Sequence, residues 1–297
     1  MSTNSVAQAS FAFQRRRAVL RKLLPRPLRR TLRWGAHLAL DGLDRCLGRK
    51  RYLVPPRSMN FVGDGNFEKT GDEFFGYFTS LGGLEPQHSV LEVGCGIGRM
   101  ARPLAGYLAG GYEGFDIVPA GIEWCRNNIT ARHPNFHFTL ADIYNSQYNP
   151  GGRLHASDYR FPYGDARFDF AFLTSVFTHM TFAGTANYLR ELARVLAPGG
   201  RCLATFFLLN QESRRLMGEG LSSLEFRHPI DRAWTTDTQG PETTIGYEEN
   251  GALAELLAAS GFVVELVRYG CWCGRSQFLS YQDVMVLRRL PAEKRSL

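Results

Sequence analysis

The sequence of 297 residues has no long uninterrupted apolar run, and this absence excludes several classes of protein. No stretch approaches the roughly 18 consecutive apolar residues that a transmembrane helix needs, so we expect no membrane span. Arg and Lys interrupt every apolar run near the N-terminus before it reaches the length of a signal-peptide core, so we expect no secretory signal. Internal repeats and low-complexity segments are also absent from the sequence.

Cysteine is sparse as well. Six cysteines are spread along the chain, without the paired spacing of a zinc site or the density of a disulfide-stabilised domain. The closest pair, Cys271 and Cys273, has no neighbouring ligands and is expected to lie in a packed hairpin tip. We therefore expect no metal and a reducing, cytoplasmic setting.

An excess of positive charge is present but is confined to one end of the chain. Residues 1–51 hold 13 Lys and Arg against two acidic residues, a net charge of +11, whereas the remaining residues carry −4. The protein is thus predicted to be a mildly acidic body with a basic arm. This distribution argues against a nucleic-acid groove that runs across the whole domain.

Leucines in the arm recur with helical spacing. After Pro25 and Pro27, apolar residues return every three or four positions between arginines, at Leu28, Leu32, Ala36, Leu40, Leu43 and Leu47. Such a helix suits an anionic membrane surface, which would place the protein at the inner face of a membrane through residues 15–51. A solvated or partner-packed extension is the alternative.

From about residue 88, short apolar runs alternate with amphipathic stretches, the pattern of βα units on a parallel sheet. This predicts one α/β domain over residues 61–290, after an extension and linker at 1–60 and before a tail at 291–297. Residues 209–247 are expected to form a polar, irregular insertion on the substrate side. Strands are expected at 90–93, 112–115, 136–140, 168–173, 202–208, 262–267 and 284–287.

The most informative segment is Val90-Leu-Glu-Val-Gly-Cys-Gly-Ile-Gly-Arg99. Gly94, Gly96 and Gly98 directly follow a predicted strand, where they allow a tight turn and let a ligand approach backbone N–H groups. A dinucleotide fingerprint would require Gly or Ala at position 99, but the residue is Arg99. Asp116, at the end of the second predicted strand, suits the two hydroxyls of a ribose.

The order and spacing of these motifs resemble the class I S-adenosylmethionine-dependent methyltransferases of the small-molecule, type 11-like group. The resemblance covers residues 88–208 and includes Glu92, Asp142 after the third strand, and Arg194-Val-Leu-Ala-Pro-Gly-Gly200 before the fifth. It implies a Rossmann-like, seven-stranded, mostly parallel sheet with an antiparallel seventh strand and helices on both faces. It also implies S-adenosyl-L-methionine as the cofactor.

The resemblance assigns roles to individual residues. The loop Gly94–Gly98 would pass under the methionyl and ribose parts of the cofactor, Glu92 would orient the loop, and Asp116 would bind the ribose hydroxyls. Asp142 would face the adenine amino group, and Ile117 and Ile143 would pack on the two faces of the ring.

The segment at 174–180 follows the fourth predicted strand, at the sheet edge where ligands bind in open α/β folds. His179 is the candidate base or acceptor-orienting group for a hydroxyl acceptor; capping of the next helix or lining of the cofactor pocket is the alternative. The segment lacks the Asn/Asp-Pro-Pro-aromatic and Pro-Cys runs of related enzymes that methylate bases. A sugar, phenol or lipid-linked glycan hydroxyl is therefore favoured over nucleic acid.

Acceptor selection is expected in segments added to the core. These are the glycine-rich stretch at 61–71, which would form a lid, and the loop at 144–152 with Tyr144 and Asn145. The insertion carrying His228 and Trp234, and Trp272 between the last two strands, are further candidates, with simple packing as the alternative for each. Two other functions stay open: a non-catalytic cofactor-binding scaffold recruited by the arm, and an RNA-modifying enzyme.

Overall fold

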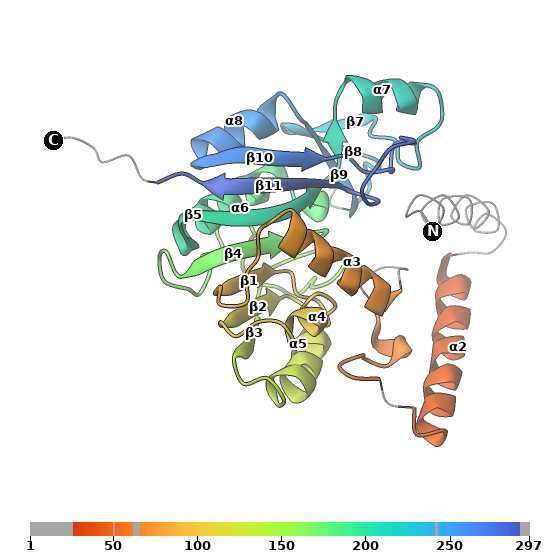
Figure 1. Cartoon of the computed structure of the whole chain (residues 1–297). Coiled ribbons are helices and arrows are strands. Elements are labelled where there is room, and N and C mark those ends of the chain that lie inside the picture. The colour runs from red at the N-terminus through yellow and green to blue at the C-terminus, as the bar shows by residue number, and fades with distance from the viewer. Residues whose placement is uncertain (1–25, 50, 62–65, 241–242, 292–297) are drawn as a thin grey trace. The chain divides into compact units, whose positions relative to one another are not determined.

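The computed structural model describes residues 26–49, 51–61, 66–240 and 243–291, with only the backbone described for 26–33 (Figure 1). The chain divides into two compact units, one ending at Asn60 and the other beginning at Phe61. The predicted insertion at 209–247 falls in the second unit. All but the first residue of the predicted tail at 291–297 lie outside the described residues.

The first unit contains the helix expected from the leucine spacing. Helix α2 spans Arg26–Cys46, with Pro27 in its first turn, where a missing N–H costs nothing. The short 3-10 helix η1 (Arg57–Met59) is bonded to α2, because Asp41 accepts hydrogen bonds from the backbone N of Arg57 (2.8 Å) and of Ser58 (2.9 Å). The Arg57 guanidinium also pairs with Asp44 at 2.6 Å. The Pro55–Pro56 linker therefore returns along the helix.

The second unit is built on a seven-stranded sheet in the order β10-β11-β5-β4-β1-β2-β3. Strand β11 is antiparallel to both of its neighbours, and the other pairings are parallel. The predicted α/β, Rossmann-like sheet with one antiparallel strand is confirmed. The strands are β1 (Val90–Val93), β2 (Tyr112–Asp116), β3 (Phe136–Leu140), β4 (Phe168–Leu173), β5 (Leu196–Phe206), β10 (Phe262–Arg268) and β11 (Asp283–Arg289).

Helices cover both faces of this sheet (Figure 1). On one face, the rings of Phe170 and Phe172 in β4 contact Phe78 of α3. The alternate β4 residues share the main hydrophobic core with Leu189 and Leu192 of α6. The helical elements are α3 (Phe67–Ser80), α4 (Ala101–Leu104), α5 (Pro119–Cys125), the π-helical turn η2 (Arg126–Thr130), η3 (Phe177–His179), α6 (Phe182–Val195), α7 (Gln211–Gly218) and α8 (Ala252–Ala259).

Strand β5 begins earlier than the sequence predicts. Helix α6 ends at Val195 and β5 starts at Leu196, so Pro198-Gly199-Gly200 lies inside the strand. The pairing with β4 shifts register between Phe168 and Phe170, and Gly199 has a φ of +82°. The bulge accommodates Pro198, Gly199 and Gly200 within the strand, although these residue types are typical of a turn.

The described residues of the insertion after β5, 209–240 and 243–247, contain regular structure, which corrects the expectation of an irregular segment. It forms a second sheet in the order β6-β9-β8-β7, with α7 beside it. Its strands are too short to show a periodic pattern in the sequence. They are β6 (Leu208–Leu209), β7 (His228–Ile230), β8 (Ala233–Thr235) and β9 (Ile245–Glu248). A second hydrophobic cluster supports this sheet, composed of Phe207, Leu209, Leu216, Phe226, Trp272 and Cys273.

Candidate active site

The glycine loop lies between β1 and α4 and requires glycine for two reasons. Gly94, Gly96 and Gly98 have φ values of +77°, +55° and +75°, in the left-handed region that favours glycine. A Cβ at Gly94 would also lie 2.5 Å from Cγ2 of Val176, and one at Gly98 would lie 2.6 Å from Cδ1 of Ile129. The loop is thus a tight backbone turn closed against two neighbouring segments.

Asp116 ends β2 and is bonded directly to this loop. Its carboxylate accepts hydrogen bonds from the backbone N of Gly96 (2.7 Å) and of Val118 (2.9 Å). Burial raises the pKa of Asp116, while these backbone donors act in the opposite direction. The carboxylate is only partly buried, so oxygen lone pairs remain for a ligand above the loop.

Glu92 lies on β1 with 1% of its surface exposed. Its carboxyl group accepts a hydrogen bond from the hydroxyl of Tyr112 on β2. Burial raises the Glu92 pKa to about 8, so the group is mostly protonated at neutral pH. Glu92 is thus a buried, hydrogen-bonded residue of the strand that precedes the loop.

Asp142, expected to face adenine, is partly exposed and is paired with another side chain. The guanidinium of Arg153 donates to the carboxylate, and the backbone N of Arg153 donates to Oδ1 at 3.2 Å. The Arg153 hydrogen bond lowers the Asp142 pKa. Ile143 is buried in the main core, and Ile117 is half-buried against it, so Ile117 is the more accessible of the two residues proposed for the ring.

The loop at 144–152 is held by its own side chains. Oδ1 of Asn145 accepts hydrogen bonds from the backbone N of Gln147 and of Tyr148, both at 3.0 Å, so this oxygen is used within the loop. The ring of Tyr144 lies against His155, with centroids 6.1 Å apart. Tyr148 was not singled out from the sequence. Burial and the charge of Asp116 raise its pKa.

His179 ends η3, directly beyond the carboxyl end of β4, and is half-buried. Val176 of the same segment is the residue that closes against Gly94. The segment is fixed from the insertion, because the hydroxyl of Tyr247 on β9 lies 2.7 Å from the carbonyl oxygen of Met180. The structure therefore brings the His179 segment next to the glycine loop.

Sequence reasoning missed a second feature of this segment. Ser175 has a φ of +59°, unusual for a residue with a side chain. Its backbone N donates to Oγ1 of Thr205 at 2.8 Å, and its hydroxyl donates to Oε1 of Gln282 at 3.0 Å. Three distant parts of the chain thus meet at the carboxyl end of β4, which no local motif could reveal.

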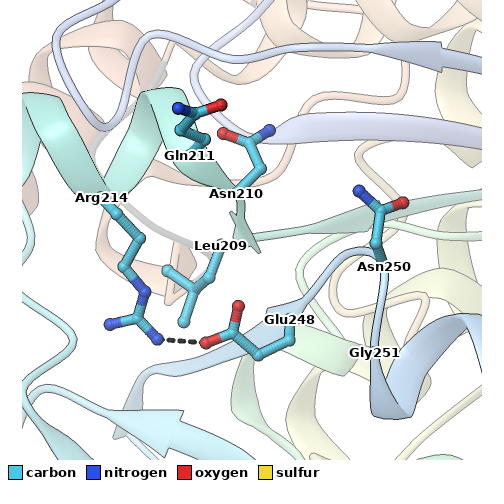
Figure 2. Close-up of a pocket in the computed structure, with 7 residues that line it drawn as sticks. All are labelled: Leu209, Asn210, Gln211, Arg214, Glu248, Asn250 and Gly251. Atoms are coloured by element: carbon cyan, nitrogen blue, oxygen red, sulfur yellow. Dashed lines mark hydrogen bonds and ion pairs between the residues drawn. The ribbon is translucent and has the colours of Figure 1, made fainter.

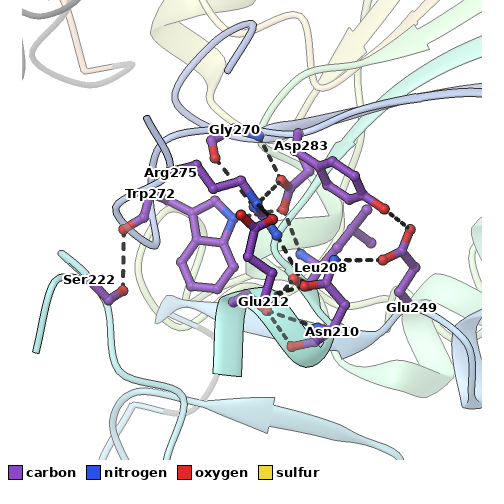
Figure 3. A network of polar contacts seen from close by, with 11 residues as sticks. Leu208, Asn210, Glu212, Ser222, Glu249, Gly270, Trp272, Arg275 and Asp283 are labelled. Carbon is purple, nitrogen blue, oxygen red and sulfur yellow. Dashed lines mark hydrogen bonds and ion pairs between the residues drawn. The ribbon is translucent and has the colours of Figure 1, made fainter. Parts of the chain in front are cut away.

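Trp272 has no exposed surface and is a core residue, which corrects its expected place in the acceptor cleft. Its indole Nε1 donates to Oδ2 of Asp283 at 2.7 Å (Figure 3). Asp283 also accepts from the backbone N of Leu208 and Gly270, each at 2.7 Å. Burial raises the Asp283 pKa to about 6 despite these donors and the nearby Arg275. The indole is buried because its N–H donates a hydrogen bond to a carboxyl group that is itself buried.

The insertion residues His228 and Trp234 lie on β7 and β8. His228 is exposed, and Trp234 is half-buried with the Arg214 guanidinium 4.3 Å from its ring centroid. Arg214 pairs with Glu248 across a cavity of about 410 Å³ (Figure 2). Glu248 follows Tyr247 on β9, so their side chains point to opposite faces of the strand. Glu248 thus lies on the side of β9 opposite to Tyr247, whose hydroxyl reaches η3.

None of the helices in the described ranges has the length and apolar character needed to cross a membrane.

The comparisons with known proteins agree with this geometry. Residues 90–200 match the family described as a methyltransferase domain. O-methyltransferase cnsE of Penicillium expansum is 33% identical over 38% of this chain and 35% of its own length. Demethylmenaquinone methyltransferase of Deinococcus radiodurans is 29% identical over 50% of this chain and 56% of its own length. The chain thus covers less than two thirds of either relative.

Two solved structures share the fold. The PH0226 protein of Pyrococcus horikoshii OT3 has a TM-score of 0.52 at 18% identity, covering 78% of this chain and 95% of that one. The 1,6-didemethyltoxoflavin-N1-methyltransferase of Burkholderia thailandensis, solved with its named substrate and S-adenosylhomocysteine, has a TM-score of 0.50 at 18% identity, covering 87% and 89%. The matched range contains β1 to β4 and the glycine loop, so this part of the chain is similar to methyltransferase domains.

Proposed function

We propose that the protein transfers the methyl group of S-adenosylmethionine to a hydroxyl of a small molecule, a sugar or a lipid-linked glycan. The observation that carries this proposal is the bond between Asp116 and the backbone N of Gly96, which joins the ends of β1 and β2 into one ligand-binding turn. The similarity to O-methyltransferase cnsE supports oxygen as the acceptor atom.

The residues of the turn fit this cofactor. Gly94, Gly96 and Gly98 leave the backbone open to a ligand, and the remaining lone pairs of Asp116 suit ribose hydroxyls. When bound, S-adenosylmethionine supplies an electrophilic methyl group on a positively charged sulfur. Asp142 reaches an adenine amino group only if Arg153 shares or releases its carboxylate.

The chain's own contribution is alignment, exclusion of water and removal of one proton. The η3 segment, held by Tyr247, brings His179 to the carboxyl end of β4. An imidazole is suited to accept the proton of an acceptor hydroxyl near neutral pH. Alignment of the acceptor oxygen with the methyl carbon contributes more to the rate than proton removal does, because it converts a bimolecular step into a local one.

A tritiated methyl-transfer assay tests this proposal, with the small molecules of a cell extract as acceptors. His179→Ala is expected to keep S-adenosylhomocysteine affinity and to reduce turnover by roughly 10²-fold or more. Unchanged turnover would remove His179 from its role as base. Cofactor binding without any transfer would favour the non-catalytic scaffold, and loss of transfer after ribonuclease treatment would favour the RNA-modifying enzyme.

We further propose that α2 docks on an anionic membrane surface. The polar side of the helix, with Asp41 and Asp44, is occupied by the residues of η1. The apolar side is open: Leu40 and Leu43 of α2, and Leu47 directly after the helix, are 46%, 52% and 54% exposed. Because both acidic residues of the arm are already bonded to Arg57 or Ser58, the remaining charge of the arm is positive. A basic helix with an apolar side matches an anionic lipid surface.

Vesicle sedimentation tests the membrane proposal on the full chain. The protein is expected to sediment with vesicles containing a third phosphatidylserine and to stay in solution with purely phosphatidylcholine vesicles. Leu43→Glu is expected to abolish sedimentation, whereas Leu221→Glu, an exposed leucine of the second unit, is the matched control. Equal behaviour of the two variants would refute docking through α2.

A further inference from the structure

Ser175 is held in a conformation that its own side chain disfavours. Its φ of +59° lies in the left-handed region, two residues beyond the end of β4. The hydrogen bond from its backbone N to Oγ1 of Thr205 maintains this conformation, because Thr205 is fully buried in β5. The consequence is a fixed position for the serine hydroxyl, which is exposed at this edge of the sheet.

The partner of this hydroxyl is equally well fixed. Gln282 directly precedes Asp283, which pairs with Phe206 at the end of β5 and accepts three hydrogen bonds of 2.7 Å (Figure 3). Gly270 lies so close that a Cβ there would be 2.6 Å from the carbonyl oxygen of Gln282. The amide of Gln282 thus stands on rigid backbone, beside the carboxyl ends of β4 and β5.

The pair of Ser175 and Gln282 presents one donor and one acceptor to a ligand. The serine hydroxyl donates to the amide oxygen at 3.0 Å, which leaves the amide NH₂ as a donor and the lone pairs of the serine oxygen as acceptors. Rotating the amide by 180° exchanges the two roles but still leaves one donor and one acceptor. The offered chemistry is therefore independent of the amide orientation.

We propose that Ser175 and Gln282 bind the acceptor group itself and select a hydroxyl, an inference that rests on the proposed methyl transfer. An alcohol oxygen has two lone pairs: one attacks the methyl carbon, and the other accepts a hydrogen bond from the donor of the pair, while the O–H gives its proton to His179. A neutral amine nitrogen has a single lone pair, which must point at the methyl carbon. An amine that displaces water from the pair would leave its donor without an acceptor, which costs free energy.

The location of the pair agrees with this role. Val176, the next residue after Ser175, is the one whose Cγ2 lies 2.5 Å from the Cβ position of Gly94. The pair is thus adjacent to the loop that holds the cofactor.

In the reaction, the acceptor oxygen forms a C–O bond as the C–S bond breaks with both electrons going to sulfur. The hydroxyl proton leaves to His179, and the products are a methyl ether and S-adenosylhomocysteine.

The test combines two variants with an analysis of products. Ser175→Gly removes the hydroxyl and suits a φ of +59°, so its Tm should equal or exceed that of the wild type. Its dissociation constant for S-adenosylhomocysteine should stay within about twofold, and the amount of acceptor needed for half-maximal rate should rise about tenfold. Gln282→Ala should likewise keep the affinity for S-adenosylhomocysteine and raise the amount of acceptor needed for half-maximal rate. The acceptors are the deproteinised small molecules of a cell extract, and cation exchange separates neutral methyl ethers from methylated amines.

Ala166→Gly provides the matched control. Ala166 has a φ of +51° and lies before β4, at the opposite end of the strand from Ser175. Its glycine variant should gain stability in the same way and transfer methyl groups at the wild-type rate. Methylated amines as the products, or a Ser175→Gly variant with unchanged acceptor dependence, would overturn the inference while leaving methyl transfer intact. A wild-type protein that transfers no methyl group to any acceptor would overturn the proposed function with it.

Discussion

At the scale of single residues, Glu92 makes the stability of the protein depend on pH. Its pKa is about 8 in the folded chain against 4.5 as the ordinary value. Between these values the folded state holds one proton more than the unfolded state, so the free energy of unfolding falls as the pH rises, by up to about 1.4 kcal/mol per pH unit.

Glu92→Gln is expected to reduce this slope between pH 6.5 and 8, because the amide keeps a hydrogen bond to Tyr112 and cannot ionise. The window lies above the Asp283 pKa of about 6, so the titration of Asp283 contributes little. Thermal or urea unfolding of both proteins without cofactor measures the effect. Parallel pH profiles would show that Glu92 is already ionised in the folded state.

Gly94 is the glycine whose replacement should affect the loop most directly. Gly94→Ala would force a Cβ to within 2.5 Å of Val176 at a φ of +77°, so cofactor affinity is expected to fall by about tenfold or more. The control is Gly106→Ala, where nothing lies within 4 Å of the new Cβ. Calorimetric titration with S-adenosylhomocysteine compares them, and equal affinities would mean that the loop can shift to admit a side chain.

Residues that belong to a local motif could be predicted from the sequence. Residues that only the fold brings together could not. Gly94 and Asp116 follow from strand ends and spacing. Ser175 and Gln282 are 107 residues apart, and only the sheet order brings them together. Trp272 looked like a cleft residue because its need to satisfy Asp283 appears only in the folded chain.

At the scale of elements, Tyr247 connects the second sheet to η3. Its hydroxyl lies 2.8 Å from Oγ1 of Thr185 and 2.7 Å from the carbonyl oxygen of Met180, and all of these contacts are buried or partly buried. Tyr247→Phe is expected to lower the free energy of unfolding by about 1–3 kcal/mol, because buried partners lose their hydrogen bonds. Turnover should also fall, because His179 lies in the segment that the hydroxyl fixes.

Urea unfolding and methyl transfer measure the two effects of Tyr247→Phe. Tyr107→Phe is the control, since its hydroxyl bonds a single carbonyl oxygen, that of Leu84, at 2.9 Å and away from η3. It should cost about 1 kcal/mol of stability and leave turnover unchanged. A Tyr247→Phe variant with wild-type turnover would show that η3 does not depend on β9 for its position.

The central strands were predictable because buried strands of a parallel sheet read as short apolar runs between turn residues. The start of β5 was not, because a proline and two glycines inside the strand give a turn signal that the bulge overrides. The second sheet was missed for a different reason. Its strands have two to four residues, and their partners lie far along the chain, so no periodic pattern develops.

At the scale of the whole molecule, the chain divides at the boundary between Asn60 and Phe61. Each unit has its own internal bonds: α2 is tied to η1 in the first, and the second contains the complete sheet. A protein lacking residues 1–60 is therefore expected to unfold cooperatively and to bind S-adenosylhomocysteine as the full chain does, but to lose sedimentation with anionic vesicles. Failure of the shortened protein to fold would mean that the arm is part of the catalytic body.

Calorimetric titration of the full chain with S-adenosylmethionine probes the cofactor site without any knowledge of the acceptor. We expect one site per chain and an affinity at least about tenfold weaker in Asp116→Ala, because the ribose would lose a charged hydrogen-bond acceptor. The absence of binding by the wild-type protein, or the same dissociation constant for both proteins, would contradict the assignment of the glycine loop and Asp116 as the cofactor site.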